Sequence, residues 1–120
     1  MRLNHINLVV TDVAEAIQFF EKYFGFACVA VKGNNLISVL KGADGFELVL
    51  MSSSMNKKAN FEYPEDFHIG FKQNTKEAVD DMHNKLTKDG ISTGREPGKI
   101  RDSYGFYFYF DKIMIEVSTD

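Results

Sequence analysis

This sequence of 120 residues contains only one cysteine, Cys28. One cysteine cannot form a disulfide within the chain, and Cys28 lies in an apolar run, so we expect a small buried core residue. Basic residues are scattered rather than clustered, and the net charge is −3. Nucleic-acid binding needs a basic stripe or patch. We therefore expect no nucleic-acid partner.

Long hydrophobic runs are also missing. No apolar stretch approaches the roughly 20 residues of a membrane-spanning helix, and the N-terminus lacks the pattern of a signal peptide. We expect no membrane partner and a cytoplasmic location. What is present is ordinary for a soluble globular protein, with 44% hydrophobic and 26% charged residues. The length predicts one domain with a single sizeable core.

Hydrophobic periodicity predicts a strand, a helix and three strands, and then the same order again. In the first half, Asp12 is the expected helix N-cap, with Glu15 in the third helical position, and Gly25 ends the helix. In the second half, Asn74, Glu77 and Gly90 take these roles. The expected strands cover residues 3–10, 26–31, 36–41 and 46–51, and then 67–73, 91–95, 104–110 and 113–118.

The two halves form an internal repeat, because both begin with a His-Ile pair and continue to an Asx-x-x-Glu cap. The pairs are His5-Ile6 and His68-Ile69. We predict an α+β fold in which residues 1–51 and 67–120 are half-modules of one domain, 1–120. Residues 52–66, a polar stretch with Lys57-Lys58 and Pro64, connect them.

Each half also carries an isolated glutamate on its last strand, among apolar neighbours. Alternation places Glu47 opposite the apolar face of its strand, and Glu116 opposite Ile115 and Val117. If the half-sheets curl toward one another, His5, Glu47, His68 and Glu116 converge. Imidazole nitrogens and carboxylate oxygens suit one divalent ion of Zn, Ni, Co, Fe or Mn. A lone histidine is more often a hydrogen-bonded structural residue, but the duplication favours the metal site.

Three other features have plainer interpretations. His83 falls on the polar side of its helix, and we expect a solvated side chain. Arg101 precedes the aromatic strand and either neutralises an anionic substrate or faces solvent. The aromatic residues of that strand share one face, which core packing explains more simply than a substrate wall does; they are Tyr104, Phe106, Phe108 and Phe110.

From Leu3-Asn4-His5 to Ile115-Glu116 the sequence resembles the vicinal oxygen chelate superfamily. This superfamily includes glyoxalase I, extradiol dioxygenases, fosfomycin-resistance enzymes, methylmalonyl-CoA epimerase and bleomycin-resistance proteins. The resemblance implies duplicated βαβββ modules that form a curved, cleft-enclosing mixed β-sheet with the helices outside. It also implies a metal site at His5, Glu47, His68 and Glu116, a ligand pattern most like that of bacterial glyoxalase I.

The sequence departs from glyoxalase I where that enzyme holds glutathione. Val9 and Met51 stand at the positions of the Arg and Asn, and neither side chain can bind a peptide carboxylate. The turn before the last strand, Asp111-Lys112, is two residues shorter than in many members. We therefore expect a substrate other than a glutathione adduct.

The resemblance implies a mechanism in which a bound ion polarises a carbonyl and stabilises an enediolate. Glu116 is then the first candidate for the base that moves a proton, Glu47 is the second, and Arg101 is the candidate substrate-binding residue.

Two functions follow. The first is a metal-dependent lyase, isomerase or epimerase that acts on a small oxygenated substrate. The second is a non-catalytic protein of the bleomycin-resistance type, which sequesters a flat or hydrophobic small molecule. Either would be a homodimer. A purely structural metal is the least supported interpretation, because a core of this size needs no metal to fold.

Overall fold

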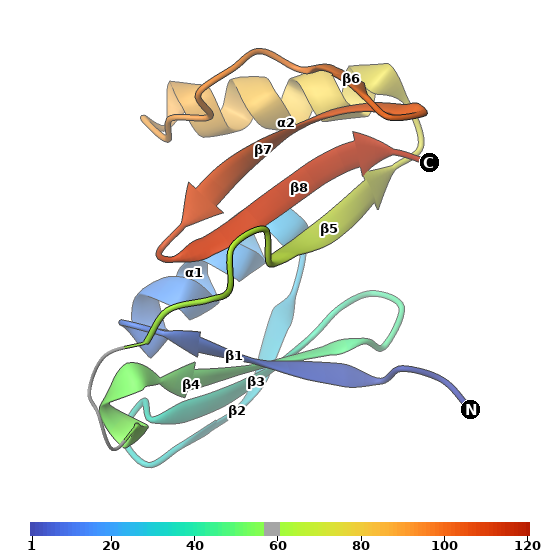
Figure 1. The fold of residues 1–120 in the computed structure, drawn as a ribbon. Helices are drawn as coiled ribbons and strands as arrows, with labels where there is room; N and C mark the ends of the chain where they lie inside the picture. Colours follow the sequence, from blue (N-terminus) through green and yellow to red (C-terminus); the bar gives the residue numbers. More distant parts are fainter. Residues whose placement is uncertain (57–60) are drawn as a thin grey trace. The chain divides into compact units, whose positions relative to one another are not determined.

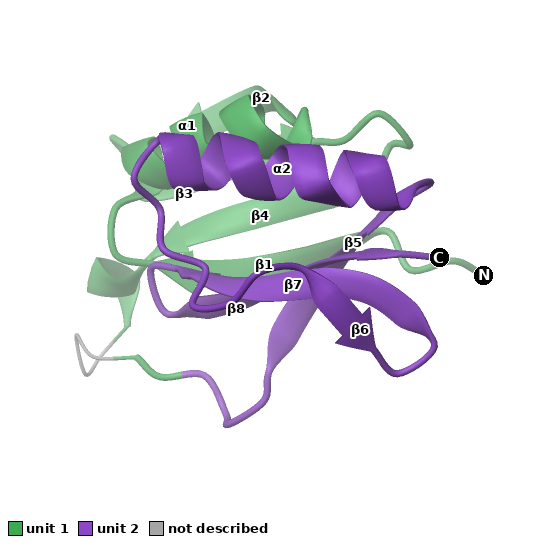
Figure 2. Ribbon diagram, turned by 90° about the horizontal axis from the view of Figure 1, so that it is seen from above, with its two compact units in different colours: residues 1–62 green, residues 63–120 purple. Residues whose placement is uncertain are grey.

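The elements follow the order that the repeat predicts (Figure 1). A computed structural model describes residues 1–56 and 61–120, and the chain divides into two compact units, Met1–Glu62 and Tyr63–Asp120 (Figure 2). The first contains β1 (His5–Val10), α1 (Val13–Phe24), β2 (Ala27–Lys32), β3 (Ile37–Lys41), β4 (Glu47–Ser52) and the short 3-10 helix η1 (Ser53–Met55). The second contains β5 (His68–Gln73), α2 (Lys76–Lys88), β6 (Gly98–Ile100), β7 (Ser103–Phe110) and β8 (Ile113–Thr119).

Each unit is one βαβββ module with a mixed four-stranded sheet. The strand orders are β1-β4-β3-β2 and β5-β8-β7-β6, so the second unit repeats the topology of the first. In both, the first strand pairs with the last in parallel, and the remaining pairs are antiparallel. The predicted α+β duplication of modules is therefore confirmed.

Alternation along the strands separates a core face from an open face in the first unit. Leu8 and Val10 are fully buried on one face of β1, while His5 lies on the other. The helix α1 begins where Asp12 accepts a hydrogen bond from the backbone N–H of Glu15, at 3.1 Å. This cap satisfies one of the unpaired N–H groups of the first turn, as predicted. Gly25 ends the helix in the left-handed conformation, as was also expected.

The second helix begins one residue later than predicted. Thr75, not Asn74, caps α2, and its Oγ1 accepts from the N–H of Ala78 at 3.1 Å. The buried stripe consists of Val79, His83 and Leu86, which follow the i, i+4, i+7 spacing of one helix face. The apolar spacing of Ala78, Met82 and Leu86 in the sequence indicates a different inner face, which shares only Leu86 with the observed one.

The interpretation of His83 as a solvated residue was wrong. Its exposure is only 5%, and its Nε2 lies 2.8 Å from Oγ1 of Thr93. The ring packs edge-on against Phe106, with 5.1 Å between the ring centroids. One hydroxyl partner and one aromatic neighbour allow the imidazole to be buried in place of an apolar side chain.

The third strand of the second unit also differs from its prediction. Residues 91–95 form no strand; instead Gly94 has a φ of 73° and the N–H of Arg95 bonds back to the carbonyl of Thr93. The strand is β6, within the segment expected to be a loop, and it pairs with β7 through Gly98 and Gly105. A left-handed glycine interrupts an extended run, which explains why pairing begins only after Pro97.

Two further predictions concern the first unit and the connection. Cys28 is half-buried on β2, an edge strand of its sheet, rather than a fully buried core residue. The connection contains η1, and the Lys57-Lys58 part of it lies outside the described residues. In the part of the chain that the structure describes, neither helix has the length and apolarity to cross a bilayer.

Candidate functional site

The first candidate pair lies at the start of two neighbouring parallel strands. His5 opens β1, Glu47 opens β4, and the two are register partners, which places their Cα atoms about 4.8 Å apart. Both face away from buried Leu48 and Leu50. The Glu47 side chain is 30% exposed, and its Oε2 lies 3.8 Å from Nζ of Lys41. Within this unit, the parity inferred from the sequence is correct.

The second pair is offset by two residues along the strands. His68 is the register partner of Met114, whereas Glu116 is the partner of Gly70. The Glu116 carboxylate lies over Gly70, where an added Cβ atom would be 3.9 Å from Oε2. Nε2 of His68 is 3.8 Å from Oε1 of Glu116. The structure therefore brings this pair together, with two potential metal-ligand atoms facing each other.

Both histidines present Nε2 as the free ring nitrogen. Nδ1 of His68 lies 2.8 Å from the backbone carbonyl oxygen of Asp66, and Nδ1 of His5 lies 3.3 Å from Oδ1 of Asn4. A carbonyl oxygen only accepts hydrogen bonds, so Nδ1 carries the proton and a neutral ring keeps its lone pair on Nε2. An oxygen acceptor on the far nitrogen is the usual arrangement for a metal-binding histidine.

The Glu116 carboxylate is held by a hydrogen-bond network that was not predicted from the sequence. Ser118 Oγ donates to Oε2 of Glu116 at 2.6 Å and accepts from Nζ of Lys72 at 3.0 Å. The hydroxyl of Tyr107 donates to the same carboxylate. Desolvation is the largest single effect on the pKa of Glu116 and raises it. The hydrogen bonds from Ser118 and Tyr107 and the charge of Lys72, with a smaller effect of His68 when its ring is protonated, outweigh desolvation and lower the pKa. The group is therefore held ionised.

Ser118 was recognisable from alternation along its strand, whereas Tyr107 is identified only by the pairing register that the structure shows. Tyr107 is the register partner of Glu116, and Ser118 lies two residues beyond Glu116 on the same face of β8. The hydrogen bond to Glu116 is the main cause that raises the pKa of the Tyr107 phenol, followed by burial. The Tyr107 ring also stands edge-on to His68, with 5.8 Å between centroids. The alternate aromatic residues, Phe106 and Phe108, are buried in the core as predicted.

Arg101 lies in the turn between β6 and β7, where its φ is 49°. Its charge acts on Tyr107 and lowers the pKa of the phenol, against the stronger effects that raise it. Its role in substrate binding stays a prediction.

The donor chemistry fits a divalent ion, but a complete site is not assembled among the described residues. No group of three or more His, Cys, Asp or Glu side chains in this part of the chain lies close enough to hold a metal. Each unit supplies one imidazole and one carboxylate, which are ligands for first-row divalent metals. The set of His5, Glu47, His68 and Glu116 stays a prediction.

Comparisons with known proteins agree with the module architecture. The family model of the Glyoxalase/Bleomycin resistance protein/Dioxygenase superfamily matches residues 2–118. A structure of a possible glyoxalase from Bacillus cereus is 40% identical, covers 98% of this chain and 97% of that chain, and gives a TM-score of 0.84.

Two more distant matches are informative. The E126Q mutant of the fosfomycin resistance protein FosX from Listeria monocytogenes, complexed with Mn(II) and 1S,2S-dihydroxypropylphosphonic acid, is 21% identical with a TM-score of 0.79 and coverages of 99% and 92%. This likeness shows the fold alone. A virulence protein of Salmonella typhimurium is 27% identical over 80% of this chain, and the match spans 65% of that protein's length. The chain belongs to the Glyoxalase/Bleomycin resistance protein/Dioxygenase superfamily, as its resemblance to vicinal oxygen chelate proteins predicted.

Proposed function

We propose that this protein is a divalent-metal-dependent lyase, isomerase or epimerase of the glyoxalase type that acts on a small oxygenated substrate without glutathione. In this proposal His5, Glu47, His68 and Glu116 hold one ion of Zn, Ni, Co, Fe or Mn. The Mn(II) bound by FosX supports a divalent ion in a protein of this fold.

The observation that carries the proposal is the preparation of His68 and Glu116 as ligands. Nδ1 of His68 is occupied by the Asp66 carbonyl, and Oε2 of Glu116 is occupied by Ser118. The two atoms that remain, Nε2 and Oε1, lie 3.8 Å apart. Such supporting hydrogen bonds orient ligands before a metal arrives and increase metal affinity.

A bound ion would act as a Lewis acid toward a substrate carbonyl. The chain must then supply a base that takes a proton from a neighbouring carbon. The hydrogen bonds that lower the pKa of Glu116 make this carboxylate a good ligand and a weaker base. The lowered pKa of Glu116 therefore favours Glu47, the second candidate from the sequence, as the residue that transfers the proton.

The proposed independence from glutathione has support in the first unit. Val9 and Met51 are register partners on β1 and β4, so the two departures from glyoxalase I lie side by side. The Met51 sulfur accepts a hydrogen bond from the Asn7 side chain at 3.4 Å. Neither Val9 nor Met51 offers a charge to a peptide carboxylate.

Metal content tests the proposal most directly. Protein purified without added metal or chelator should contain a substantial fraction of one equivalent by mass spectrometry, and added metal should raise the melting temperature through its preferential binding to the folded state. Less than about a tenth of an equivalent and no thermal shift would reject the metal-dependent function.

Substitutions divide the roles. His5→Ala and His68→Ala should each reduce the bound metal, whereas Glu65→Gln, at an exposed position in the connection, should not. If Glu47 is the base, Glu47→Gln loses turnover of a carbonyl substrate more completely than it loses metal. A Glu116→Gln variant that keeps both metal and turnover would remove Glu116 from the site.

The second candidate is a non-catalytic binding protein for a small molecule. The apolar pair Val9 and Met51 favours it, since that surface suits a hydrophobic ligand. Ligand binding by metal-free protein together with no detectable metal would favour this function. The homodimer and the cytoplasmic location belong to either proposal; light scattering of the purified protein measures the assembly, and a monomeric mass would exclude the dimer.

A further inference from the structure

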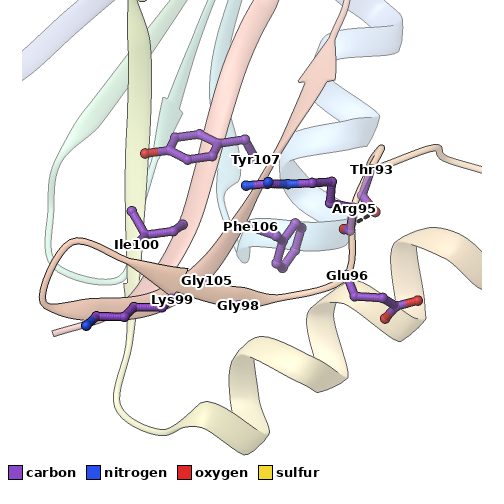
Figure 3. A pocket seen from close by; sticks show the side chains of 9 residues that line it. All are labelled: Thr93, Arg95, Glu96, Gly98, Lys99, Ile100, Gly105, Phe106 and Tyr107. Carbon is purple, nitrogen blue, oxygen red and sulfur yellow. Dashed lines mark hydrogen bonds between the residues drawn. The ribbon is translucent and has the colours of Figure 1, made fainter.

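A pocket of about 430 Å³ lies in the second unit, where the short β6 runs beside β7 (Figure 3). Its size is within the range of roughly 300–1,000 Å³ that holds small organic ligands. The residues that line it include Arg95, Gly98, Ile100, Gly105, Phe106 and Tyr107.

Two glycines face each other at the pocket, and one of them, Gly98, leaves open space. Gly98 and Gly105 are register partners on β6 and β7, so both strands lack a side chain at the same level. A Cβ atom added to Gly98 would have no heavy atom within 4 Å, which shows open space beside this residue. A Cβ atom added to Gly105 would overlap the carbonyl oxygen of Val117, so the backbone packs too closely there for any side chain.

Arg95 supplies a cation that has no anionic partner. Its hydrogen bonds to the described residues are made by the backbone: the N–H donates to the Thr93 carbonyl at 2.8 Å, and the carbonyl accepts from Thr93 Oγ1 at 3.2 Å. These bonds fix the loop, while no carboxylate among the described residues pairs with the guanidinium. Figure 3 shows the Arg95 side chain extending alongside Phe106 and Tyr107.

The neighbouring carboxylate does not neutralise Arg95. The Glu96 side chain is 90% exposed, and its Oε2 lies 3.9 Å from Nδ1 of His83 on α2. In Figure 3 it points toward the helix, away from the guanidinium. The positive charge of Arg95 is therefore available to a ligand.

Tyr107 connects this pocket to Glu116. One side of Tyr107 lines the pocket, and its hydroxyl donates a hydrogen bond to the Glu116 carboxylate. A ligand in the pocket would thus be separated from the candidate metal ligand by a single side chain.

We infer that this pocket binds a small organic anion and that such an anion is the substrate class of the proposed function. Its oxyanion group pairs with Arg95, because a guanidinium offers parallel N–H donors to carboxylate or phosphonate oxygens. Its apolar or planar part lies against Ile100, Phe106 and Tyr107. That the anion is a substrate rests on the proposed function, whereas binding of the anion in this pocket requires no metal.

The test uses metal-free full-length protein and three probes that differ in charge. Phenylacetate and phenylphosphonate are added to ¹⁵N-labelled protein, with neutral phenylacetamide as the matched control, and amide shifts are followed by NMR. Saturable shifts should appear at Arg95, Gly98, Gly105 and Tyr107 with the anions. The neutral probe should bind about tenfold more weakly or worse, the loss expected for a charge-assisted hydrogen bond. The two anions together rank the preferred head group.

Three variants locate the site. Arg95→Gln should weaken anion binding about tenfold or more, and Gly98→Leu should abolish it by filling the open space. Arg2→Gln makes the same charge change in the other unit and should leave the affinity unchanged. The dispersion of each spectrum reports whether the variant is folded.

Two results would overturn the inference. One is the absence of saturable shifts with either anion. The other is binding that survives Arg95→Gln but is lost in Arg101→Gln, which would move the anion site to the turn. Anion binding at Arg95 in a protein that takes up no metal would leave this inference standing while rejecting the metal-dependent enzyme, so the two failures are distinguishable.

Discussion

Ser118 donates a 2.6 Å hydrogen bond to Oε2 of Glu116, and this bond distinguishes the two oxygens of the carboxylate. Lys72 reinforces it, since its Nζ donates to the Ser118 hydroxyl at 3.0 Å and lies 3.9 Å from Oε2 itself. Oε1 is left on the side of His68, 3.8 Å from Nε2. Ser118 is fully buried and is not one of the four predicted metal ligands. Its hydrogen bond nevertheless determines which oxygen of Glu116 is available to a metal.

Removal of this hydroxyl should weaken metal binding. Ser118→Ala removes the hydrogen bond to Oε2 and one of the two hydrogen bonds of Lys72, whose other acceptor is the Thr119 carbonyl, so the carboxylate can rotate away from His68. Loss of a supporting hydrogen bond of this kind typically costs about 10- to 100-fold in metal affinity. A competition titration against a chromophoric chelator measures the change. Ser38→Ala, which alters a buried serine of the other unit, should leave the affinity unchanged, and equal affinities for all three proteins would contradict the proposed role.

Acid should destabilise the metal-free protein in part through Glu116. The folded-state pKa of this group lies below its ordinary value of 4.5, so folding favours the ionised form. The contribution is complete above the unfolded pKa, near 4.5, and disappears as the pH falls from there through the lower folded value. Denaturant unfolding at pH values from about 3 to 6, which bracket ordinary carboxyl pKa values, measures it.

The variant Glu116→Gln isolates this contribution. In this variant the free energy of unfolding should fall less steeply as the pH is lowered, because the amide does not titrate. Glu65→Gln, at an exposed position, should show the same dependence of the unfolding free energy on pH as the parent protein. A profile for Glu116→Gln that is as steep as that of the parent would show that the lowered pKa of Glu116 does not contribute.

The order and faces of the elements were predictable because they depend on local signals. Alternation along β1 placed His5 opposite Leu8, and the cap at Asp12 and the stop at Gly25 bounded α1. The same signals placed Glu116 opposite Ile115 and Val117. Pairing register was not predictable in this way, and the offset of two residues between His68 and Glu116 appears only in the structure.

The missed features depend on contacts between segments that are distant in sequence. His83 looks polar in a helix of low hydrophobicity, and only its contacts with Thr93 and Phe106 explain its burial. The place of β6 follows from pairing with β7 and from the left-handed Gly94, not from periodicity. Likewise, the pocket at Arg95 depends on the path of an irregular loop, for which the sequence carries no repeating signal.

Ser38 offers a stability prediction that is independent of the site. It is only 1% exposed, and among the described residues its Oγ has no hydrogen-bond partner. A buried hydroxyl without a partner keeps its desolvation penalty, so Ser38→Ala should stabilise the protein by about 1 kcal/mol. Urea unfolding measures the difference. Ser103→Ala is the comparison, because Oγ of Ser103 donates to the Ile100 carbonyl at 3.0 Å, and its loss should destabilise. Destabilisation by both substitutions would indicate that Ser38 has a partner in solution.

The register partners Gly98 and Gly105 should respond oppositely to the same added methyl group. At Gly105 a Cβ atom would overlap the Val117 carbonyl oxygen and lie 2.6 Å from Cβ of Ser118, whereas at Gly98 it would meet no heavy atom within 4 Å. Gly105→Ala should therefore destabilise the fold by about 1–3 kcal/mol, the usual cost of overpacking, and Gly98→Ala should stay within about 0.5 kcal/mol of the parent.

The same substitution should also reach the candidate metal site. Relief of the overlap at Gly105 must displace the backbone at Val117 and Ser118, and Ser118 holds Oε2 of Glu116. Gly105→Ala should accordingly lower metal affinity in protein that is still folded, while Gly98→Ala should not. Urea unfolding and the chelator titration on one preparation of each variant separate the two effects. Equal metal affinity in a destabilised Gly105→Ala protein would show that Ser118 keeps its bond to Glu116 despite the displacement, and the coupling between this strand pair and the site would be rejected.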